Sequence, residues 1–299
     1  MKESSGPLAG TGTDNVRGAL WILASCLLFA TMSALAKIAG ERLHSFEVSF
    51  FRAFFGFVLL LPLILRAGPG VWRTSRLHLH ITRGTVGSLG LLFGFYAVTH
   101  MPLAEATALG FTKPLFQVLL AAFALREVVR LRRWVATAVG FLGVLVMLRP
   151  DTGNLEIAAL AGLAGALCGA TVSVTLRHMV RLERELTILA WLGVVGTIVT
   201  GLPALFVWQT PTPGELGLLL CMAAVGTVSQ VCLMRGFRVG EASAMAPIDY
   251  SRLPLSAFYG VILFAEWLDP LAILGAAIIA ASTLYIARRE AALARQGRG

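Results

Sequence analysis

The chain has 299 residues, of which 57% are hydrophobic and only 14% charged, and its mean hydropathy is +0.78. Soluble domains carry about a quarter charged residues, so this composition excludes an ordinary soluble enzyme. A net charge of +9 would suit a nucleic-acid binder or a membrane protein. Because the hydropathy is so high, we interpret the charge as the Lys and Arg excess that flanks transmembrane helices, and we expect no nucleic-acid partner.

Ten apolar runs follow one another along the chain, each near the roughly 20 residues that cross a bilayer as a helix. Turns rich in Pro and Gly separate several of them. No segment between them is long enough for a soluble domain. We therefore expect an all-α integral membrane protein with a single domain over residues 1–299 and polar tails at 1–16 and 289–299. The expected spans are 17–38, 46–66, 81–99, 104–125, 131–149, 156–177, 187–208, 215–235, 241–264 and 269–288.

The first span also has features of a secretory signal. The triplet Ala34-Leu35-Ala36 after the first apolar run resembles a signal-peptidase site, and cleavage there would leave nine helices. The length of the run and the internal repeat described below favour ten.

The Lys and Arg residues are distributed very unevenly over the connecting segments. If the N-terminus is cytoplasmic and the spans alternate, 19 of the 25 lie on the cytoplasmic side, and only Arg42 and Arg149 lie in the opposite loops. The remaining four fall within spans or at their ends. This bias predicts that both termini are cytoplasmic in a multi-pass, bacterial-type inner-membrane protein.

An internal repeat divides the chain into two halves of five spans, at about 17–150 and 151–288. Glu105-Ala106-Thr107-Ala108-Leu109 matches Glu241-Ala242-Ser243-Ala244-Met245, and each is followed by a proline within the span and a glutamate at its end. Because five is odd, the second half enters the membrane from the opposite side. Such inverted repeats build a site near the midplane that opens alternately to either side.

Distinctive segments occur in both halves, at 95–98, 101–106 and the run ending at Glu127, then at 235–238, 240–244, 246–250 and 264–266. These segments resemble the drug/metabolite transporter superfamily, in particular its EamA-type ten-helix exporters. Within it, the length and helix number are similar to aromatic amino-acid exporters of the YddG type. The resemblance implies alternating-access export of small metabolites, most readily amino acids including aromatic ones; drugs or other amphipathic metabolites are the alternative.

Other classes of function find little support in the sequence. A membrane-embedded enzyme would need motifs such as HExxH or GxSxG, and the chain has neither. It also lacks a phosphate-binding GxxxxGK[ST] loop, so we expect secondary transport rather than ATP-driven transport. A passive channel would need a polar lining from end to end, whereas the interior polar residues here are few.

The four cysteines give no sign of a metal or disulfide site. All lie in apolar runs without CxxC spacing, so we expect packing roles, no metal and no cofactor. Gly165-x-x-x-Gly169 and Gly236-x-x-x-Gly240 are expected to pack helices within one chain, and a monomer is expected.

Charged residues within the spans are candidates for function because they are costly there. Counted from Glu105 and Glu241, Lys113 and Asp249 occupy equivalent positions with opposite charge. They either form a salt bridge between the halves or present two poles to a zwitterion, Lys113 toward a carboxylate and Asp249 toward an ammonium. An unpaired Asp249 would instead suit proton relay.

Three more interior charges are candidates for charge pairs or coupling. Arg252 lies three residues after Asp249, where an ion pair within the helix is expected. Glu47 and Arg52 lie near one end of the second span, and we expect both to snorkel to the interface rather than line a pore. Lys37 is expected to do the same, while Glu266 has no basic neighbours that would suggest a role.

Polar and aromatic side chains complete the candidate substrate site. Gln117 shares a helix face with Lys113, and Tyr250 adjoins Asp249. Aromatic rings beside polar groups suit an amphipathic organic substrate, although packing is the commoner role of each ring taken singly. The other candidates are Trp21, Tyr96, Trp191, Gln230 and Tyr259.

Pro114 and Pro254 interrupt the fourth and ninth spans. Proline within a helix removes a backbone hydrogen bond and kinks it, so both are hinge candidates for alternating access.

Overall fold

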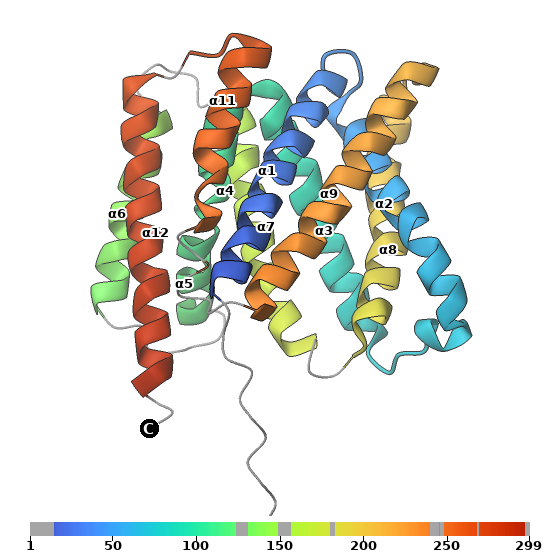
Figure 1. The fold of residues 1–299 in the computed structure, drawn as a ribbon, viewed down its shortest axis with the longest axis horizontal. Coiled ribbons are helices and arrows are strands. Elements are labelled where there is room, and N and C mark those ends of the chain that lie inside the picture. Colours follow the sequence, from blue (N-terminus) through green and yellow to red (C-terminus); the bar gives the residue numbers. More distant parts are fainter. Residues whose placement is uncertain are drawn as a thin grey trace, which may run out of the picture.

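The structure is a computed structural model that describes residues 15–123, 131–148, 157–179, 183–239, 245, 248–267 and 269–296. Every regular element in these ranges is helical, which confirms the all-α expectation (Figure 1). The elements are α1 (Asn15–Ala39), α2 (Ser45–Ala67), the 3-10 helix η1 (Pro69–Trp72), α3 (Leu77–His100), α4 (Leu103–Gly110), α5 (Lys113–Phe123), α6 (Leu131–Leu148), α7 (Ile157–Met179), α8 (Glu185–Phe206), α9 (Pro213–Val239), α11 (Arg252–Phe264) and α12 (Pro270–Gln296).

Nine spans within the described ranges are long and apolar enough to cross a membrane. Eight are single helices that overlap the predicted runs. The remaining one, the fourth span at Leu103–Phe123, is made of α4 and α5. The span predicted at 241–264 is described mainly as α11, which has 13 residues, and most of its earlier part lies outside the described residues. The chain is therefore a multi-pass membrane protein.

The two repeats are interleaved rather than set side by side. The most extensive helix contacts join α1 to α9, α3 to α7, and α6 to α12. The first helix of each half thus packs on the third helix of the other half, and the two fifth helices pack together. Contacts of α2 with α8 and of α4 with α11 complete the pseudo-symmetric arrangement. Figure 1 shows the α6–α12 pair at one edge of the bundle, and the start of α1 and the end of α12 at the same end.

Glycines allow the closest helix approaches. A Cβ added at Gly165 on α7 would lie 3.2 Å from the Gly94 backbone nitrogen on α3. One added at Gly236 on α9 would lie 2.6 Å from the Ile22 side chain on α1. The predicted intramolecular packing role is confirmed for Gly165 and Gly236, whereas Gly240 lies outside the described residues.

The α6–α12 contact is tighter still. A Cβ at Gly275 on α12 would lie 2.6 Å from the Gly143 carbonyl oxygen and 2.8 Å from the Met147 backbone nitrogen on α6. Because backbone atoms cannot move aside as a side chain can, a larger residue at position 275 must separate the two helices.

We expect Gly275→Ala to lower the free energy of unfolding by about 1–3 kcal/mol, the usual cost of overpacking a close contact. Thermal unfolding in detergent, followed by tryptophan fluorescence, measures the change. Gly217→Ala on α9 is the matched control, because a Cβ there has no neighbour within 4 Å. The control should be neutral or slightly stabilising, since alanine favours helix over glycine. Equal midpoints for the two variants would contradict the close α6–α12 contact.

Candidate functional site

The fourth span is broken rather than kinked. Thr112 donates its backbone N–H to the Leu109 carbonyl at 3.0 Å, and its hydroxyl caps the same oxygen at 2.6 Å. A new helix, α5, begins at Lys113, which places Pro114 in the first turn. The first-turn N–H groups of a helix have no acceptor within it, so proline costs little there. The expected kink of a continuous helix at Pro114 is therefore wrong.

A similar turn precedes α11. Ser251 donates its backbone N–H to Ile248 at 3.0 Å, and α11 begins at Arg252, so Pro254 again lies in the first helical turn. Both prolines thus start a helical segment after an irregular turn. Whether these turns act as hinges stays a prediction.

The two irregular turns contact one another. The Phe111 ring stacks on Tyr250, with centroids 4.4 Å apart and planes inclined by 18°. The Tyr250 hydroxyl hydrogen-bonds with Thr283 on α12. Nearby, Thr107 on α4 donates to the Ser256 hydroxyl on α11 at 2.9 Å, and both residues are buried. The broken spans of the two repeats therefore meet through aromatic and polar side chains.

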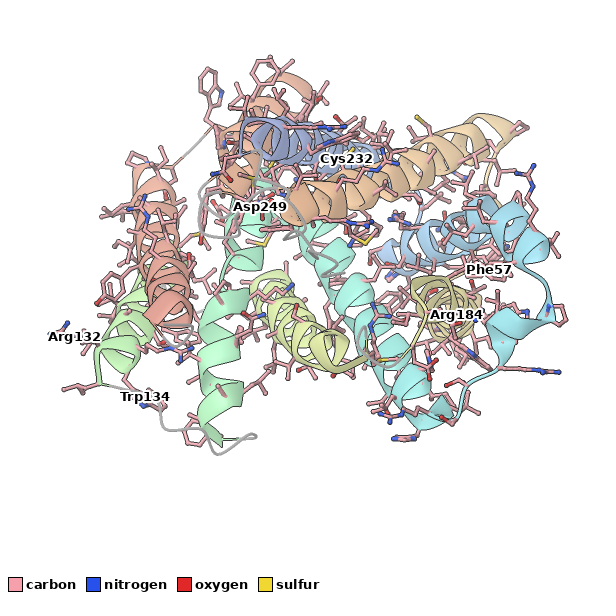
Figure 2. All side chains as sticks on the ribbon, turned by 60° about the horizontal axis from the view of Figure 1, so that its bottom comes forward. Phe57, Arg132, Trp134, Arg184, Cys232 and Asp249 are labelled. Carbon is pink, nitrogen blue, oxygen red and sulfur yellow. The ribbon has the colours of Figure 1, made fainter. Side chains whose placement is uncertain are left out.

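Asp249 lies at this junction and contacts α1. Its carboxylate forms the expected ion pair with Arg252, whose Nη2 is 2.8 Å from Oδ1. The Cys26 thiol on α1 donates to the Asp249 carbonyl oxygen at 3.5 Å, and Arg252 lies over the Phe29 ring at 4.4 Å. Figure 2 shows Asp249 in the interior of the bundle, whereas Arg132 on the peripheral α6 points outward. The site thus places a carboxylate and a guanidinium against the face of α1 that carries Cys26 and Phe29.

Lys113 begins α5 and lies against α7. A Cβ added at Gly169 would lie 3.5 Å from Lys113 Cδ, so the glycine accommodates the lysine stem. The contacts described for Asp249 are with Arg252 and Cys26. The two-pole arrangement of Lys113 and Asp249 therefore stays a prediction. Gln117 on α5 is half-buried and Gln230 on α9 is exposed.

Glu47 does not snorkel, which corrects our expectation. Its side chain is fully buried and accepts the backbone N–H of His44 at 3.2 Å and of Gln209 at 2.9 Å. The first of these bonds completes a cap of α2, in which His44 Nδ1 accepts the backbone N–H of Phe46 at 3.2 Å. Desolvation, with a smaller effect of the nearby His100 charge, lowers the pKa of His44. Glu47 therefore ties the start of α2 to the end of α8.

Arg52 does not snorkel either. Its Nε atom is buried and has no hydrogen-bond partner in the part of the chain that the structure describes. Added Cβ atoms at Gly56 and Gly226 would lie 2.8 Å from its Nη1 and 2.7 Å from its Nε, respectively. The two glycines hold the guanidinium between α2 and α9 instead of at the interface.

The remaining aromatic candidates are spread over the bundle. Tyr259 on α11 hydrogen-bonds with Thr31 on α1 at 2.9 Å. It therefore belongs to the same α1–α11 contact as Arg252 and Phe29. Tyr96 stacks on His100 near the last turn of α3, with centroids 4.1 Å apart. Trp21 lies beneath the Arg235 guanidinium at 5.1 Å.

Trp191 lies away from the broken spans. It packs edge-on against Trp72 at 5.8 Å and lies 6.3 Å from the buried His80 ring. His80 is in the first turn of α3 and Trp72 ends η1, so this cluster is at the end of the bundle where α1 starts and α12 ends (Figure 1). The structure does not bring Trp191 together with Asp249.

Sequence reasoning missed a contact between the repeats at the opposite end of the bundle. Lys37 at the end of α1 forms an ion pair with Glu266, which follows α11, and donates to the Met101 carbonyl at 2.7 Å. The other carboxylate oxygen of Glu266 accepts the Leu103 backbone N–H at 2.8 Å. Lys37 therefore does not simply snorkel, and Glu266 joins the end of α1 to the start of α4. Its apolar surroundings in the sequence were the signal that its partner had to be distant.

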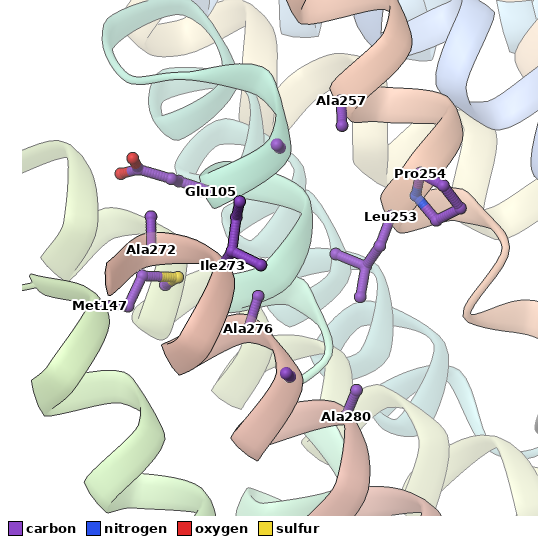
Figure 3. Close-up of a pocket in the computed structure, with 11 residues that line it drawn as sticks. Glu105, Met147, Leu253, Pro254, Ala257, Ala272, Ile273, Ala276 and Ala280 are labelled. Carbon is purple, nitrogen blue, oxygen red and sulfur yellow. The ribbon is translucent and has the colours of Figure 1, made fainter. Parts of the chain in front are cut away.

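An apolar groove of about 260 Å³ lies between α4, α6, α11 and α12 (Figure 3). Its lining is mostly alanine and aliphatic, with Pro254 and Glu105 at its wall. Because it offers so few polar groups, we do not assign the substrate to it. It leaves space beside Pro254, where the ninth span starts its second segment.

Interleaved inverted repeats, two broken spans and an interior charge cluster together define a membrane transporter fold. Comparison with known proteins gives the family. The model of the EamA-like transporter family matches residues 16–149 and again residues 156–288. The chain belongs to this family.

Curated relatives over nearly the whole chain are transporters with different substrates. An S-adenosylmethionine uptake transporter of Rickettsia prowazekii is 34% identical, over 92% of this chain and 94% of its own. A riboflavin transporter of Rhizobium johnstonii is 31% identical, over 92% of each chain. The pseudopaline exporter CntI of Pseudomonas aeruginosa is 30% identical, over 91% of this chain and 96% of its own. None of these names is that of an aromatic amino-acid exporter.

A solved crystal structure shares the fold. It aligns with a TM-score of 0.60 over 91% of this chain and 98% of its own, at 22% identity. At this identity the likeness concerns the fold alone.

The Lys37–Glu266 contact predicts a change in access at its end of the bundle. Glu266→Ala leaves Lys37 and the Leu103 N–H without their partner, and an unmet hydrogen bond of this kind costs roughly 1 kcal/mol or more. Leu103→Cys, placed in a variant without the four native cysteines, reports access at this end through its rate of labelling by a maleimide. We expect this rate to be about fivefold higher when Glu266→Ala is added than when Glu266 is kept. Glu41→Ala, which removes an exposed carboxylate at the same end, is the control and should leave labelling unchanged. Identical labelling rates would show that the contact does not hold this end closed.

Proposed function

We propose that the chain is a secondary transporter of S-adenosylmethionine or a closely related zwitterion that joins an amino acid to an aromatic base. The observation that carries the proposal is the interior Asp249 carboxylate at the junction of the broken spans, with the Phe29, Phe111 and Tyr250 rings around it. A half-buried carboxylate inside the bundle suits an ammonium or sulfonium cation, and the rings suit stacking on a base. The 34% identical uptake transporter supports this choice of substrate.

This proposal narrows the amino-acid substrate expected from the sequence. S-Adenosylmethionine is itself an α-amino acid with an aromatic base, so it satisfies both the zwitterion and the aromatic preference. Riboflavin carries neither an ammonium nor a carboxylate, so it offers no cation that could replace Arg252 as the partner of Asp249. We therefore favour the zwitterion over the flavin as the substrate class.

The direction of transport is part of the proposal. The relatives include both named uptake transporters and a named exporter, and we infer uptake from the most similar of those compared above. The export expected from the sequence is the alternative. Alternating access, both termini in the cytoplasm, an inner-membrane location, a monomer and the lack of enzymatic activity stay as predicted.

The first experiment measures exchange of labelled S-adenosylmethionine in proteoliposomes loaded with unlabelled substrate. Wild type should show saturable exchange, and Asp249→Asn should lower its rate about tenfold or more because a buried cation loses its partner. Glu41→Gln, an exposed carboxylate outside the spans, is the control and should exchange at the wild-type rate.

Thermal unfolding of Asp249→Asn separates loss of the site from loss of the fold. No exchange by folded wild-type protein would reject S-adenosylmethionine as the substrate. Net flux from the two sides in separate experiments decides between uptake and export.

A further inference from the structure

Arg52 is a half-buried cation whose Nε atom has no hydrogen-bond partner among the residues that the structure describes. It lies in the first half of α2, within a membrane span, and its Nε atom is buried. Among the residues that the structure describes, none accepts a hydrogen bond from it or forms an ion pair with it. The nearest charged neighbour in sequence, Glu47, is committed to the His44 and Gln209 backbone.

The space around this guanidinium is formed by specific small residues. Added Cβ atoms would lie 2.8 Å from Nη1 at Gly56 on α2, and 2.7 and 2.9 Å from Nε and Nη2 at Gly226 on α9. The Met32 sulfur on α1 reaches the same point, 2.4 Å from the added Gly226 Cβ. Arg52 thus occupies a slot between three helices, and alanine at either glycine would collide with it.

An unpaired charge in such a slot is destabilising. Burying an ion without compensation costs several kcal/mol in proteins, and an arginine at membrane depth costs at least as much. A methionine would fill the slot without that cost. An anion that binds during part of the transport cycle would compensate the charge.

The single guanidinium favours a carboxylate as the anion. A guanidinium presents parallel N–H groups that match the two oxygens of a carboxylate. Arg52 is a single cation, which balances one negative charge rather than the two of a phosphate monoester. The neighbouring groups in the slot are the Met32 sulfur, two glycines and the nearby Thr227 hydroxyl.

Arg52 is also connected to the Asp249 site through α1. Phe29 lies under Arg252, the partner of Asp249, and Met32 reaches the Arg52 slot. These two residues are three positions apart in α1, so they lie on one helix face. A cation-binding group and an anion-binding group thus border the same face of α1.

We propose that Arg52 binds the carboxylate of the transported substrate while Asp249 binds its cationic group. This inference rests on the proposed function and assigns the anionic pole to Arg52 instead of Lys113. Among the described residues, Arg52 has no hydrogen-bond or ion-pair partner that a substrate carboxylate would have to displace.

The test compares exchange of S-adenosylmethionine with that of its decarboxylated analogue, which differs only by the carboxylate. Arg52→Met should lower the rate for S-adenosylmethionine about tenfold or more and leave the analogue within about twofold, so the preference disappears. Arg52→Lys should keep part of the preference, because it keeps the charge but loses the planar fork. Lys113→Met, and Arg73→Gln at an exposed position, should both keep the preference for S-adenosylmethionine over the analogue. An unchanged preference in Arg52→Met, or its loss in Lys113→Met alone, overturns the proposal.

Thermal unfolding without substrate separates this inference from the proposed function. Arg52→Met should raise the midpoint, because it removes an uncompensated buried charge and keeps the slot filled. If wild type exchanges neither compound, the proposed substrate is wrong, and the unfolding midpoint still decides the role of Arg52. A lower midpoint for Arg52→Met would show that the guanidinium supports the fold and would overturn the proposal.

Discussion

Every backbone polar group within a bilayer must find a partner inside the protein, and this constraint governs the whole structure. It is met here by helices, whose backbone groups pair within each span, and it permits an interruption only where other parts of the protein surround it. The turn before α5 meets this condition by folding onto itself through Thr112 and by stacking Phe111 on the turn before α11. The place where the helices break is therefore the place where the repeats must meet.

The sequence was sufficient for the architecture because the underlying signals are strong and repeated. Hydropathy over some 20 residues locates a span whatever its neighbours are, and the matched Glu105 and Glu241 segments reveal the duplication. The Asp249–Arg252 ion pair could also be predicted from the sequence, since a spacing of three residues places both side chains on one helix face. Properties that depend on one helix alone could thus be predicted.

Properties that depend on distant helices could not. Arg52 was expected at the interface because its position in α2 allows snorkelling, but the outcome depends on Gly226, which lies on α9. Lys37 likewise has its partner in Glu266, 229 residues away. Pro114 was expected to kink a helix, whereas it starts one, because the preceding turn is stabilised by contacts with the other repeat. A single sequence holds no information on which distant side chains face one another.

The interleaving of the repeats has a consequence for biosynthesis. Ser25 on α1 exchanges hydrogen bonds with Ser229 on α9, 204 residues later in the chain. The first helix therefore enters the membrane long before its main partner has been synthesised, and neither half can bury its contact surfaces alone. Helices of the first repeat must wait in lipid with these surfaces uncovered, and native packing is completed only as the last spans emerge. An assembly of this kind folds as one unit despite its origin in two similar halves.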